Sequence, residues 1–327
     1  MYKPKNENQN GNKNKNKSKN KNRNMLEGYV SRLPGWPLLY GRDISAEVNQ
    51  DNADNKLGFF DRLNGKLDVE YIDARIRNLP REFEGYAIAC VSDLHGGHAQ
   101  TSPPLVRALA QIKPDLICML GDTIDGGTDS LDNVIAIFQA FPAIAPTIAI
   151  TGNNEYACGL MPSLKEAYAK AGIILLEDHS LTLRRGDASL RVVGIQDRYA
   201  RIVRCGVTRS ADTEGCEPVM PSAEPNTIQL LAIHRPTLAA RYLRHGFHVA
   251  LSGHAHGGQF RLFGRGIYSP GQGFLPRLTS GLYHIEGGSL IVSRGVGNHE
   301  FPLRINNPPH LPVVRLSALE GTGLRSG

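Results

Sequence analysis

The sequence contains no apolar stretch that approaches the ~20 residues needed for a membrane-spanning helix. No apolar segment follows the charged N-terminal region, so a secretory signal is not expected either. The chain has 327 residues, enough to bury a sizeable core in one large domain with extensions. These features predict a cytoplasmic protein.

Cysteine is scarce, and its five positions match neither a zinc-binding nor a disulfide framework. Cys90 and Cys118 lie within apolar runs of strand length, so we interpret them as small core residues. Cys205 and Cys216 lie in a polar segment and could pair. We favour two free thiols there, because disulfides are rare in cytosolic proteins.

Acidic residues are nearly missing from the first 24 residues, which hold seven Lys and one Arg against Glu7. This tail carries +7 and the whole chain +6, which leaves −1 for the rest. Its alternating Lys and Asn residues cannot offset their ordering entropy by burial, so we predict disorder. A solvated tail is the favoured interpretation, with attraction to anionic lipid or RNA as the alternative. Because the remainder is near neutral, nucleic-acid binding is not expected as the main function.

Residues 25–66 form an N-terminal extension whose structure the sequence does not specify. The segment includes YVSRLPGWPLLYG, with the only Trp and two prolines, so a long helix is excluded. We interpret the extension as a segment that packs on the domain or makes peripheral contact with a membrane surface.

From residue 67 onward, apolar runs of strand length alternate with segments of helical periodicity. Three apolar strands that end in polar loops are expected at residues 86–93, 116–122 and 147–155. A helical segment follows each strand, at residues 104–112, 130–141 and 162–172. After a polar insertion at residues 200–226, the same pattern returns over residues 227–258. Alternating strands and helices predict an α/β fold over residues 67–320, a layered sandwich with loops at the carboxyl ends of its strands.

A residue of metal-ligand type follows each of these strands. The seven donors are Asp93, His95, Asp122, Asn153, His234, His254 and His256. Because parallel strands place their carboxyl ends at one edge of a sheet, we expect the donors to converge on one crevice. Members of the pairs Asp93/His95 and His254/His256 are two residues apart, so they point the same way from an extended backbone.

The donor set suits a pair of divalent cations. Imidazole favours Zn and Fe, whereas carboxylate and carbonyl oxygens favour Mg and Mn, so the identity of the metal stays open. Two cations ~3.5–4 Å apart can clamp phosphate oxygens for an in-line displacement. Asp122, in the middle of the set, is the best candidate for a carboxylate that bridges both cations. Each residue alone is weak evidence, but their joint occurrence in this order predicts phosphoester hydrolysis.

The segments SDLHGG, LGD, TGNNE, AIHRP and SGHAHGGQ together resemble the calcineurin-like metallophosphoesterase family, over residues 67–317. YSPGQGFLPRLTSGLY, VSRGVG and RINNPP resemble its bacterial phosphodiesterase-like branch. The resemblance implies a β-sandwich flanked by helices, in which a metal-bound hydroxide attacks a phosphodiester or pyrophosphate at a binuclear centre. It implies that one divalent ion (Mn, Fe, Zn or Mg) is held by Asp93, His95, Asp122 and His256. The other is implied to be held by Asp122, Asn153, His234 and His254. The resemblance implies a phosphoester substrate as the binding partner, and it implies no obligate protein partner.

One position departs from the family pattern of Gly-Asn-His followed by an acidic residue. The chain has Asn154 where the family has His, a residue that contacts the phosphate and helps the leaving group depart. An amide donates a hydrogen bond but has no titratable proton, so we expect activated esters, diesters or pyrophosphates as substrates. His98 could replace the missing His, although an exposed loop residue is the favoured interpretation. The residues expected in catalysis are Asp93, His95, Asp122, Asn154 and His234.

Further loop residues receive weaker interpretations. Arg294 and His299 could face the phosphate, while Asp125 and Asp129 are expected to start the next helix, because Asp favours helix N-termini. Two other functions stay open: a membrane-surface pyrophosphatase for a nucleotide-linked lipid precursor, and a non-catalytic scaffold. The scaffold is less favoured, because all seven donors are present.

Overall fold

The computed structural model describes most of the chain that follows the N-terminal extension. The described residues are 66–97, 102–157, 159–197, 227–285, 287–298 and 303–319, all within one compact unit, Glu47–Gly327. The tail, the extension up to residue 65 and the insertion at 200–226 lie outside them, together with His98 and His299. The interpretations made for those segments, including the thiols of Cys205 and Cys216, stay predictions.

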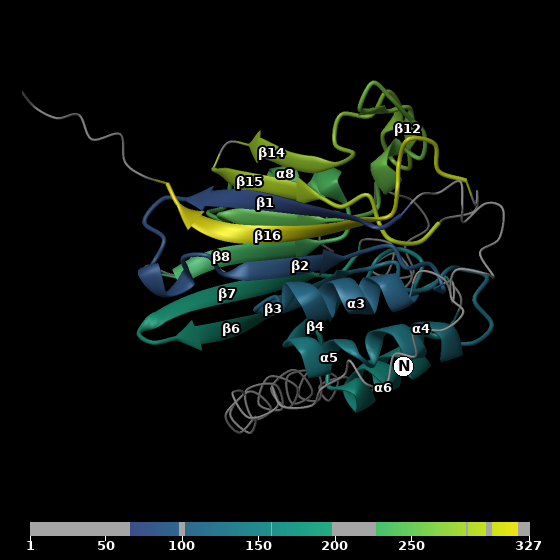
Figure 1. Ribbon diagram of the computed structural model, residues 1–327, viewed down its shortest axis with the longest axis horizontal. Coiled ribbons are helices and arrows are strands. Elements are labelled where there is room, and N and C mark those ends of the chain that lie inside the picture. The colour runs from purple at the N-terminus through teal and green to yellow at the C-terminus, as the bar shows by residue number, and fades with distance from the viewer. Residues whose placement is uncertain are drawn as a thin grey trace, which may run out of the picture. The chain divides into compact units, whose positions relative to one another are not determined.

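Two six-stranded mixed sheets form the centre of the described structure (Figure 1). The first contains, in spatial order, β1 (Asp68–Ile76), β16 (His310–Ala318), β2 (Ala87–Val91), β3 (Leu116–Leu120), β4 (Thr147–Ile150) and β5 (Ile174–Leu175). The second contains β14 (Gly281–Ile285), β15 (Gly288–Val292), β9 (Val249–Ser252), β8 (Thr227–Ile233), β7 (Ala188–Ile195) and β6 (His179–Arg185). The sandwich expected from the sequence is thereby confirmed.

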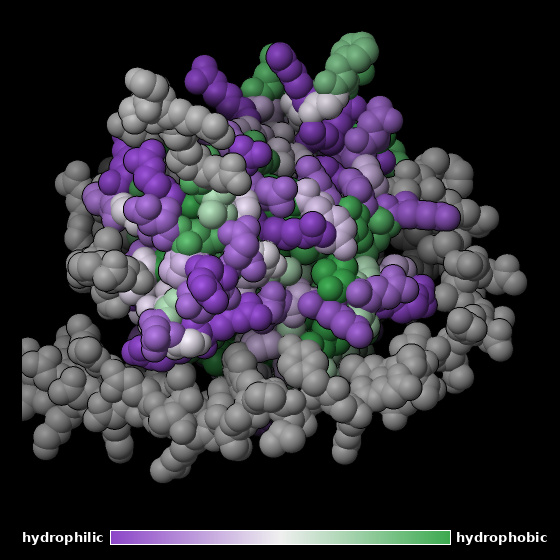
Figure 2. Space-filling model, turned by 60° about the vertical axis from the view of Figure 1, so that its left-hand side comes forward, coloured by the Kyte–Doolittle hydropathy of each residue, from purple (hydrophilic) through white to green (hydrophobic). Residues whose placement is uncertain are grey.

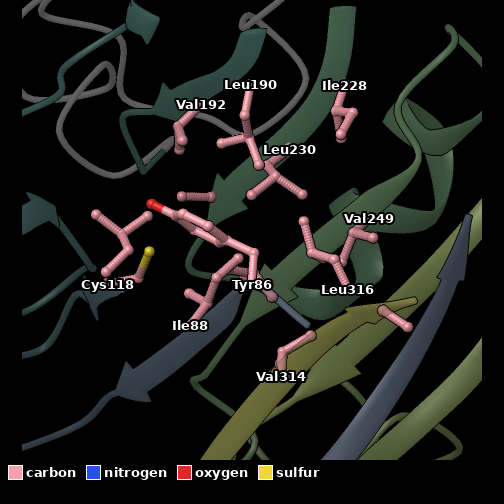
Figure 3. Close-up of a cluster of buried hydrophobic side chains, with 14 of the residues drawn as sticks. Tyr86, Ile88, Cys118, Leu190, Val192, Ile228, Leu230, Val249, Val314 and Leu316 are labelled. Carbon is pink, nitrogen blue, oxygen red and sulfur yellow. The ribbon is translucent and has the colours of Figure 1, made fainter. Parts of the chain in front are cut away.

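The main core lies between the two sheets (Figure 3). The first sheet contributes Ile88, Cys118, Val314 and Leu316, which face Leu190, Val192, Leu230 and Val249 of the second. Every residue of β3 and β4 is buried, as expected for strands covered on both faces. Cys90 and Cys118 are buried free thiols, which confirms their interpretation as core residues.

Helices cover the outer faces of the sheets (Figure 1). Against the first sheet lie α3 (Ser102–Ile112), α4 (Asp132–Phe138), α5 (Phe141–Ile144) and α6 (Met161–Ala171). Helix α8 (Pro236–Leu243) packs on the second sheet through a separate apolar cluster that includes Ala239 and Leu243. The helical segment expected over residues 130–141 is confirmed as α4, although α4 ends at Phe138. A second helix, α5, begins at Phe141 with Pro142 in its first turn, the part of a helix where proline is tolerated. None of the helices in the described residues is long and apolar enough to cross a membrane.

The strands that carry the expected donors are parallel within each sheet, but they belong to two sheets. Strands β2, β3 and β4 are parallel in the first sheet, and β8 and β9 are parallel in the second. The expectation of one sheet edge is therefore wrong. The loops after β2 and β15 are joined by hydrogen bonds from Val296 N to Ser92 O (2.9 Å) and from Gly297 N to Asp93 O (2.8 Å). These bonds bring the carboxyl ends of the two sheets together.

His310 at the start of β16 is a buried histidine with a defined hydrogen-bond pattern. Its Nδ1 accepts a hydrogen bond from Arg294 N (3.2 Å), and its Nε2 donates to Glu70 on β1 (2.8 Å). Burial lowers the pKa of His310 below its ordinary value of 6.5, and the hydrogen bond with Glu70 offsets this only in part. Protonation would place an N–H against the donating N–H of Arg294, so the folded domain favours the neutral imidazole.

His310 should make folding less stable in acid. Below pH 6.5 the unfolded chain binds a proton that folded His310 resists, so the free energy of unfolding falls as the pH drops from 7 toward 5. For one group the slope reaches at most ~1.4 kcal/mol per pH unit. His310→Gln should flatten this dependence, measured by urea unfolding at both pH values. His245→Gln, on an exposed histidine, should keep the wild-type slope. An unchanged slope in His310→Gln would contradict the assignment.

Candidate metal centre

Most of the expected donors lie in loops with an unusual backbone conformation. The left-handed region holds Asp93 (φ 54°), His95 (φ 48°), Asp122 (φ 50°), His254 (φ 66°) and His256 (φ 47°). The extended backbone expected for the two pairs is therefore wrong. This conformation is unfavourable for residues with a Cβ, although Asp and His tolerate it better than most. Such strain clusters at functional sites, where the surrounding structure maintains it.

One buried group of donors contains Asp93, His95 and His256, whose ligand atoms lie within 4.8 Å of one another. Asp93 Oδ1 is 3.3 Å from His256 Nε2 and 3.8 Å from His95 Nε2. The two Nε2 atoms are 3.0 Å apart. A carboxylate oxygen and two imidazole nitrogens thus point toward one small volume.

A second buried group contains Asp122, His234 and His254, again within 4.8 Å. His234 Nε2 is 3.1 Å from Asp122 Oδ2. His234 Nδ1 is 2.7 Å from the carbonyl oxygen of Leu120, to which it can donate a hydrogen bond. In the neutral ring this bond assigns the proton to Nδ1 and leaves the lone pair of Nε2 directed at Asp122. Metal-binding histidines are commonly oriented in this way.

The two groups adjoin each other. The backbone N–H of His254, in the second group, donates to both oxygens of Asp93, in the first (3.2 and 3.1 Å). His254 and His256 therefore serve different groups, although only one residue separates them. The two groups contain six of the seven expected donors, three in each.

The charges in the centre compensate one another. Burial raises the pKa of Asp93 and of Asp122, but the neighbouring histidines hold both well below the usual range. Burial likewise disfavours a charged His95, yet hydrogen bonds with Asp125 and Asp93 raise its pKa to about 10. Burial also disfavours a charged His234, but the charge of Asp122 raises the pKa of His234 to about 10. A divalent cation would take the place of such protons, because metal ligation requires neutral imidazole.

Asn153, the seventh expected donor, tests whether the site suits a cation. Its Oδ1 is buried and makes no hydrogen bond with any described residue. A buried acceptor without a partner costs about 1–3 kcal/mol, and a cation would supply the partner. The mixed nitrogen and oxygen donors suit Zn, Fe or Mn. The residues present therefore fit divalent metal ions.

Asn154 contacts the carboxylate of Asp122. Its backbone N–H donates to Oδ1 and its side-chain Nδ2 donates to Oδ2, both at 2.9 Å. Gly152 packs against the same carboxylate, and a Cβ at this position would overlap it. The departure from the family pattern therefore lies within the centre.

Asp125 belongs to the surroundings of the first group, and its expected role as a helix start is wrong. Helix α4 begins at Asp132, and Asp129 lies exposed in the preceding loop. The Asp125 carboxylate instead accepts a hydrogen bond from His95 Nδ1. This bond directs Nε2 of His95 toward Asp93. Nothing in the local sequence distinguishes this Asp from a loop residue.

Glu155 joins two loops beneath the centre. Fully buried, it accepts hydrogen bonds from Thr123 N (2.6 Å) and Gly152 N (2.8 Å). Burial and the charge of Asp122 raise its pKa to about 7. Glu155 thereby ties the loop after β3 to the loop after β4, and sequence reasoning did not single it out.

Arg235 places a cation beside the second group, and it was also missed. Its Nε donates to Asp197 (2.7 Å), and its Nη1 donates to His254 Nε2 (3.0 Å). Burial, and then the charges of His234 and Arg235, lower the pKa of His254 to about 3. The side chain of Arg235 is 21% exposed, so its guanidinium lies between solvent and the donors.

Arg294, which was expected to face phosphate, is engaged elsewhere. Its Nη2 lies 2.5 Å from Asp68 Oδ2, and its Nη1 donates to Ser280 Oγ (3.1 Å). The side chain therefore links the start of β1 to the loop before β14. A donor histidine, His254, instead accepts a hydrogen bond from Arg235.

Both donor groups fall within residues 86–258, which match the sequence model of the calcineurin-like phosphoesterases. The chain belongs to this family. It is therefore a metal-dependent hydrolase that acts on phosphoric ester bonds. The family expected from the sequence motifs is confirmed.

Individual relatives are distant. A metallophosphoesterase of Aquifex aeolicus is 27% identical over 257 residues, which cover 76% of the chain and 92% of the relative. Phosphodiesterase YaeI of Escherichia coli is 26% identical over 247 residues, covering 71% and 82%. Among solved structures, the sulfate thiohydrolase SoxB of Thermus thermophilus has a TM-score of 0.42 and 16% identity, covering 67% of the chain. The chain spans about half the length of that structure, 53%.

Asp125→Asn should weaken metal binding without unfolding the protein. The substitution replaces the carboxylate that accepts the hydrogen bond from His95 Nδ1 with a neutral amide. Loss of such a carboxylate partner typically costs 10–100-fold in metal affinity. Titration of the metal-stripped protein with Zn²⁺ or Mn²⁺ by calorimetry measures the change. Asp129→Asn, the same substitution on an exposed loop residue, should bind the metal like the wild type. Equal affinity in both variants would exclude a role for Asp125.

Proposed function

We propose that the chain hydrolyses phosphodiester or pyrophosphate bonds at a pair of divalent cations held by the two donor groups. The observation that carries the proposal is the placement of two buried groups of nitrogen and oxygen donors side by side, joined by the bond from His254 N to Asp93. The catalytic unit in this proposal is residues 67–320.

Each cation would take donors from both sheets. In the proposal, Asp93, His95 and His256 hold one cation, and Asn153, His234 and His254 hold the other. Asp122 would serve both, because its carboxylate has two oxygens. When bound, the cations lower the pKa of a water molecule and offset the negative charge of the phosphoryl group.

The side chains around the donors orient them and bind the substrate. Asp125 positions the ring of His95, and the carbonyl of Leu120 positions the ring of His234. Arg235, anchored on Asp197, places its guanidinium where a phosphoryl oxygen near His254 would accept its N–H groups. Guanidinium is suited to this contact because its planar donors match the geometry of phosphate.

Asn154 determines the substrate class in this proposal. Its amide contacts Asp122 and can donate hydrogen bonds, but it cannot supply a proton to a departing alkoxide. Diesters with good leaving groups and pyrophosphates need less protonation of the leaving oxygen. Metal-bound substrates of this kind are therefore favoured over simple alkyl monoesters.

Replacing the shared carboxylate tests the two-cation centre. Asp122→Asn should lower the bound metal of the purified protein from two ions toward one or none. Hydrolysis of bis(p-nitrophenyl) phosphate should fall by at least about 10²–10³-fold, the scale for loss of one electrostatic contact in a transition state. Metal analysis and kcat are measured on the same samples.

Asp187→Asn is the matched control, because Asp187 is exposed in the turn between β6 and β7. It should keep both the metal content and the activity. If Asp122→Asn retained two ions and wild-type kcat, a shared carboxylate at this position would be excluded. Activity of the wild type that depends on no divalent cation would exclude the centre as a whole.

Asn154→His should restore general-acid assistance. Such assistance typically contributes 10²–10⁴ in rate, and it acts mainly on leaving groups of high pKa. The variant should therefore raise kcat for alkyl esters while changing kcat for nitrophenyl esters little. A series of leaving groups, assayed with both proteins, gives the slope of log kcat against leaving-group pKa.

The plot of log kcat against leaving-group pKa should have a steeper negative slope for the wild type than for Asn154→His. Identical slopes would show that position 154 takes no part in leaving-group departure. Asn154→Gln, which keeps an amide, is the control and should behave like the wild type in slope even if its kcat is lower.

A further inference from the structure

Residues 260–277 form two consecutive hairpins beside the metal centre, and we refer to them as the hairpin segment. The first hairpin pairs β10 (Arg261–Leu262) with β11 (Arg265–Gly266), and the second pairs β12 (Tyr268–Ser269) with β13 (Gly273–Phe274). Ile267 joins them, because its N–H donates to Phe260 O and its carbonyl accepts from Leu275 N, both at 2.9 Å. The two hairpins therefore form one continuous unit.

The hairpin segment exposes large apolar side chains to solvent. Phe263 is 95% exposed, Phe274 80% and Leu275 76%, and Leu262 and Tyr268 are also exposed. Figure 2 shows apolar side chains protruding between hydrophilic ones at the top of the view, the level at which Figure 1 labels β12. Covering one such side chain stabilises a complex by about 1.5–3 kcal/mol, so exposed clusters commonly mark binding surfaces.

The charge of the segment identifies the kind of surface that complements it. Residues 256–285 contain Arg261, Arg265 and Arg277 but no Asp or Glu. Arg265 and Arg277 are exposed beside the apolar side chains. Protruding aromatic and aliphatic groups next to cations match the interface of an anionic bilayer, where apolar groups enter the acyl boundary and cations meet lipid phosphates.

The segment also forms part of the wall of the metal centre. A Cβ on Gly271, in the turn of the second hairpin, would lie 3.9 Å from both His254 Nε2 and Arg235 Nη1. Arg261 Nη1 donates to the carbonyl of Gly257, next to His256 (2.9 Å). At Gly258, a Cβ would overlap the backbone of Gly266. A surface that receives the hairpins therefore lies beside the donors.

We propose that the hairpin segment docks on an anionic lipid bilayer, and that the substrate is a phosphoester in the headgroup region of an amphiphile. The docking part of this proposal rests only on the apolar and basic side chains of the hairpin segment. The substrate class rests additionally on the proposed function, because it requires hydrolysis at the adjoining centre. In the docked protein, Arg235 and the donors face phosphates at the lipid surface.

Docking is tested at the position of Phe263 itself, in the full chain. Phe263→Trp is made together with Trp36→Phe, so that the one remaining indole reports the hairpin. With vesicles of two parts phosphatidylcholine to one part phosphatidylglycerol, its emission should shift to the blue, and brominated acyl chains should quench it. The control is Tyr71→Trp with Trp36→Phe, which places the indole at the exposed position 71 of β1, and it should show neither effect.

The basic tail makes this positional readout necessary, since it can hold the chain on anionic vesicles by itself. If the protein sediments with the vesicles while the indole at position 263 is neither shifted nor quenched, the docking proposal is wrong. Equal quenching in vesicles of phosphatidylcholine alone would overturn the role of the arginines. In the reporter variant, Arg265→Gln with Arg277→Gln should weaken vesicle binding, followed through quenching of the indole at position 263, about 25-fold, from ~fivefold for each lost cation.

The substrate class is tested with two esters that share a leaving group. Hexadecyl p-nitrophenyl phosphate is presented in the vesicles, and ethyl p-nitrophenyl phosphate in solution. Phe263→Ser with Phe274→Ser should lower kcat/KM for the vesicle-borne ester by about 10²-fold, from roughly tenfold for each lost aromatic group. The soluble ester should be hydrolysed at the wild-type rate.

The outcomes separate this proposal from the proposed function. Loss of both activities with intact vesicle binding would count against the inference of a lipid-borne substrate, because the hairpins would then serve the centre itself. Equal kcat/KM of wild type and variant for the vesicle-borne ester would overturn it outright. Failure of the unsubstituted protein on both esters, with quenching of the indole at position 263 retained in the reporter variant, would contradict the proposed function but not the docking.

Discussion

The burial of two ionised carboxylates next to each other is the constraint on which the rest of the centre depends. Asp93 is 0% and Asp122 1% exposed, and the charge of each opposes ionisation of the other. Cationic partners must therefore lie within a few ångströms, and histidines from both sheets supply them. A group that releases its proton to solvent when a metal ion binds is suited to this role, whereas a permanent cation such as Arg in the same position would exclude a metal. The need for exchangeable positive charge explains why imidazoles surround both carboxylates.

The packing of the loops follows from the same requirement. Donors from two sheets converge only if the chain turns sharply at the end of each strand, and five donors do so with positive φ. Gly152 leaves room for the Asp122 carboxylate, and Glu155 holds the adjoining loops through two backbone N–H groups. The strain in these loops is maintained by bonds that cross between sheets, such as the one from Gly297 N to Asp93 O. Local unfavourable conformations and the long-range contacts that maintain them are therefore one feature of the fold.

Sequence reasoning succeeded where a pattern is local. The apolar runs ending before Asp93 and Asp122 predicted β2 and β3, because burial on both faces requires uninterrupted apolar residues. It failed where the outcome depends on distant partners. Periodicity cannot show that the second set of strands forms its own sheet. Nor can it show that His254 turns to His234 while His256 turns to His95. Asp125 was assigned to a helix start because local propensity outweighed a contact with His95, 30 residues away, that the sequence does not display.

Two residues of the centre, Asn154 and Arg235, concern the same physical problem, the charge that develops on a departing oxygen. Asn154 places an amide without a titratable proton next to Asp122, while Arg235 places a permanent cation next to His254. A guanidinium stabilises an anionic phosphoryl group by charge and by paired hydrogen bonds, but it does not protonate a leaving alkoxide. In the proposed function, Asn154 and Arg235 together shift assistance from proton donation to binding of charge. That shift favours substrates whose leaving group is itself a stable anion. Phosphodiesters and pyrophosphates keep a negative charge that Arg235 can bind throughout the reaction, so Asn154 and Arg235 support the same substrate class.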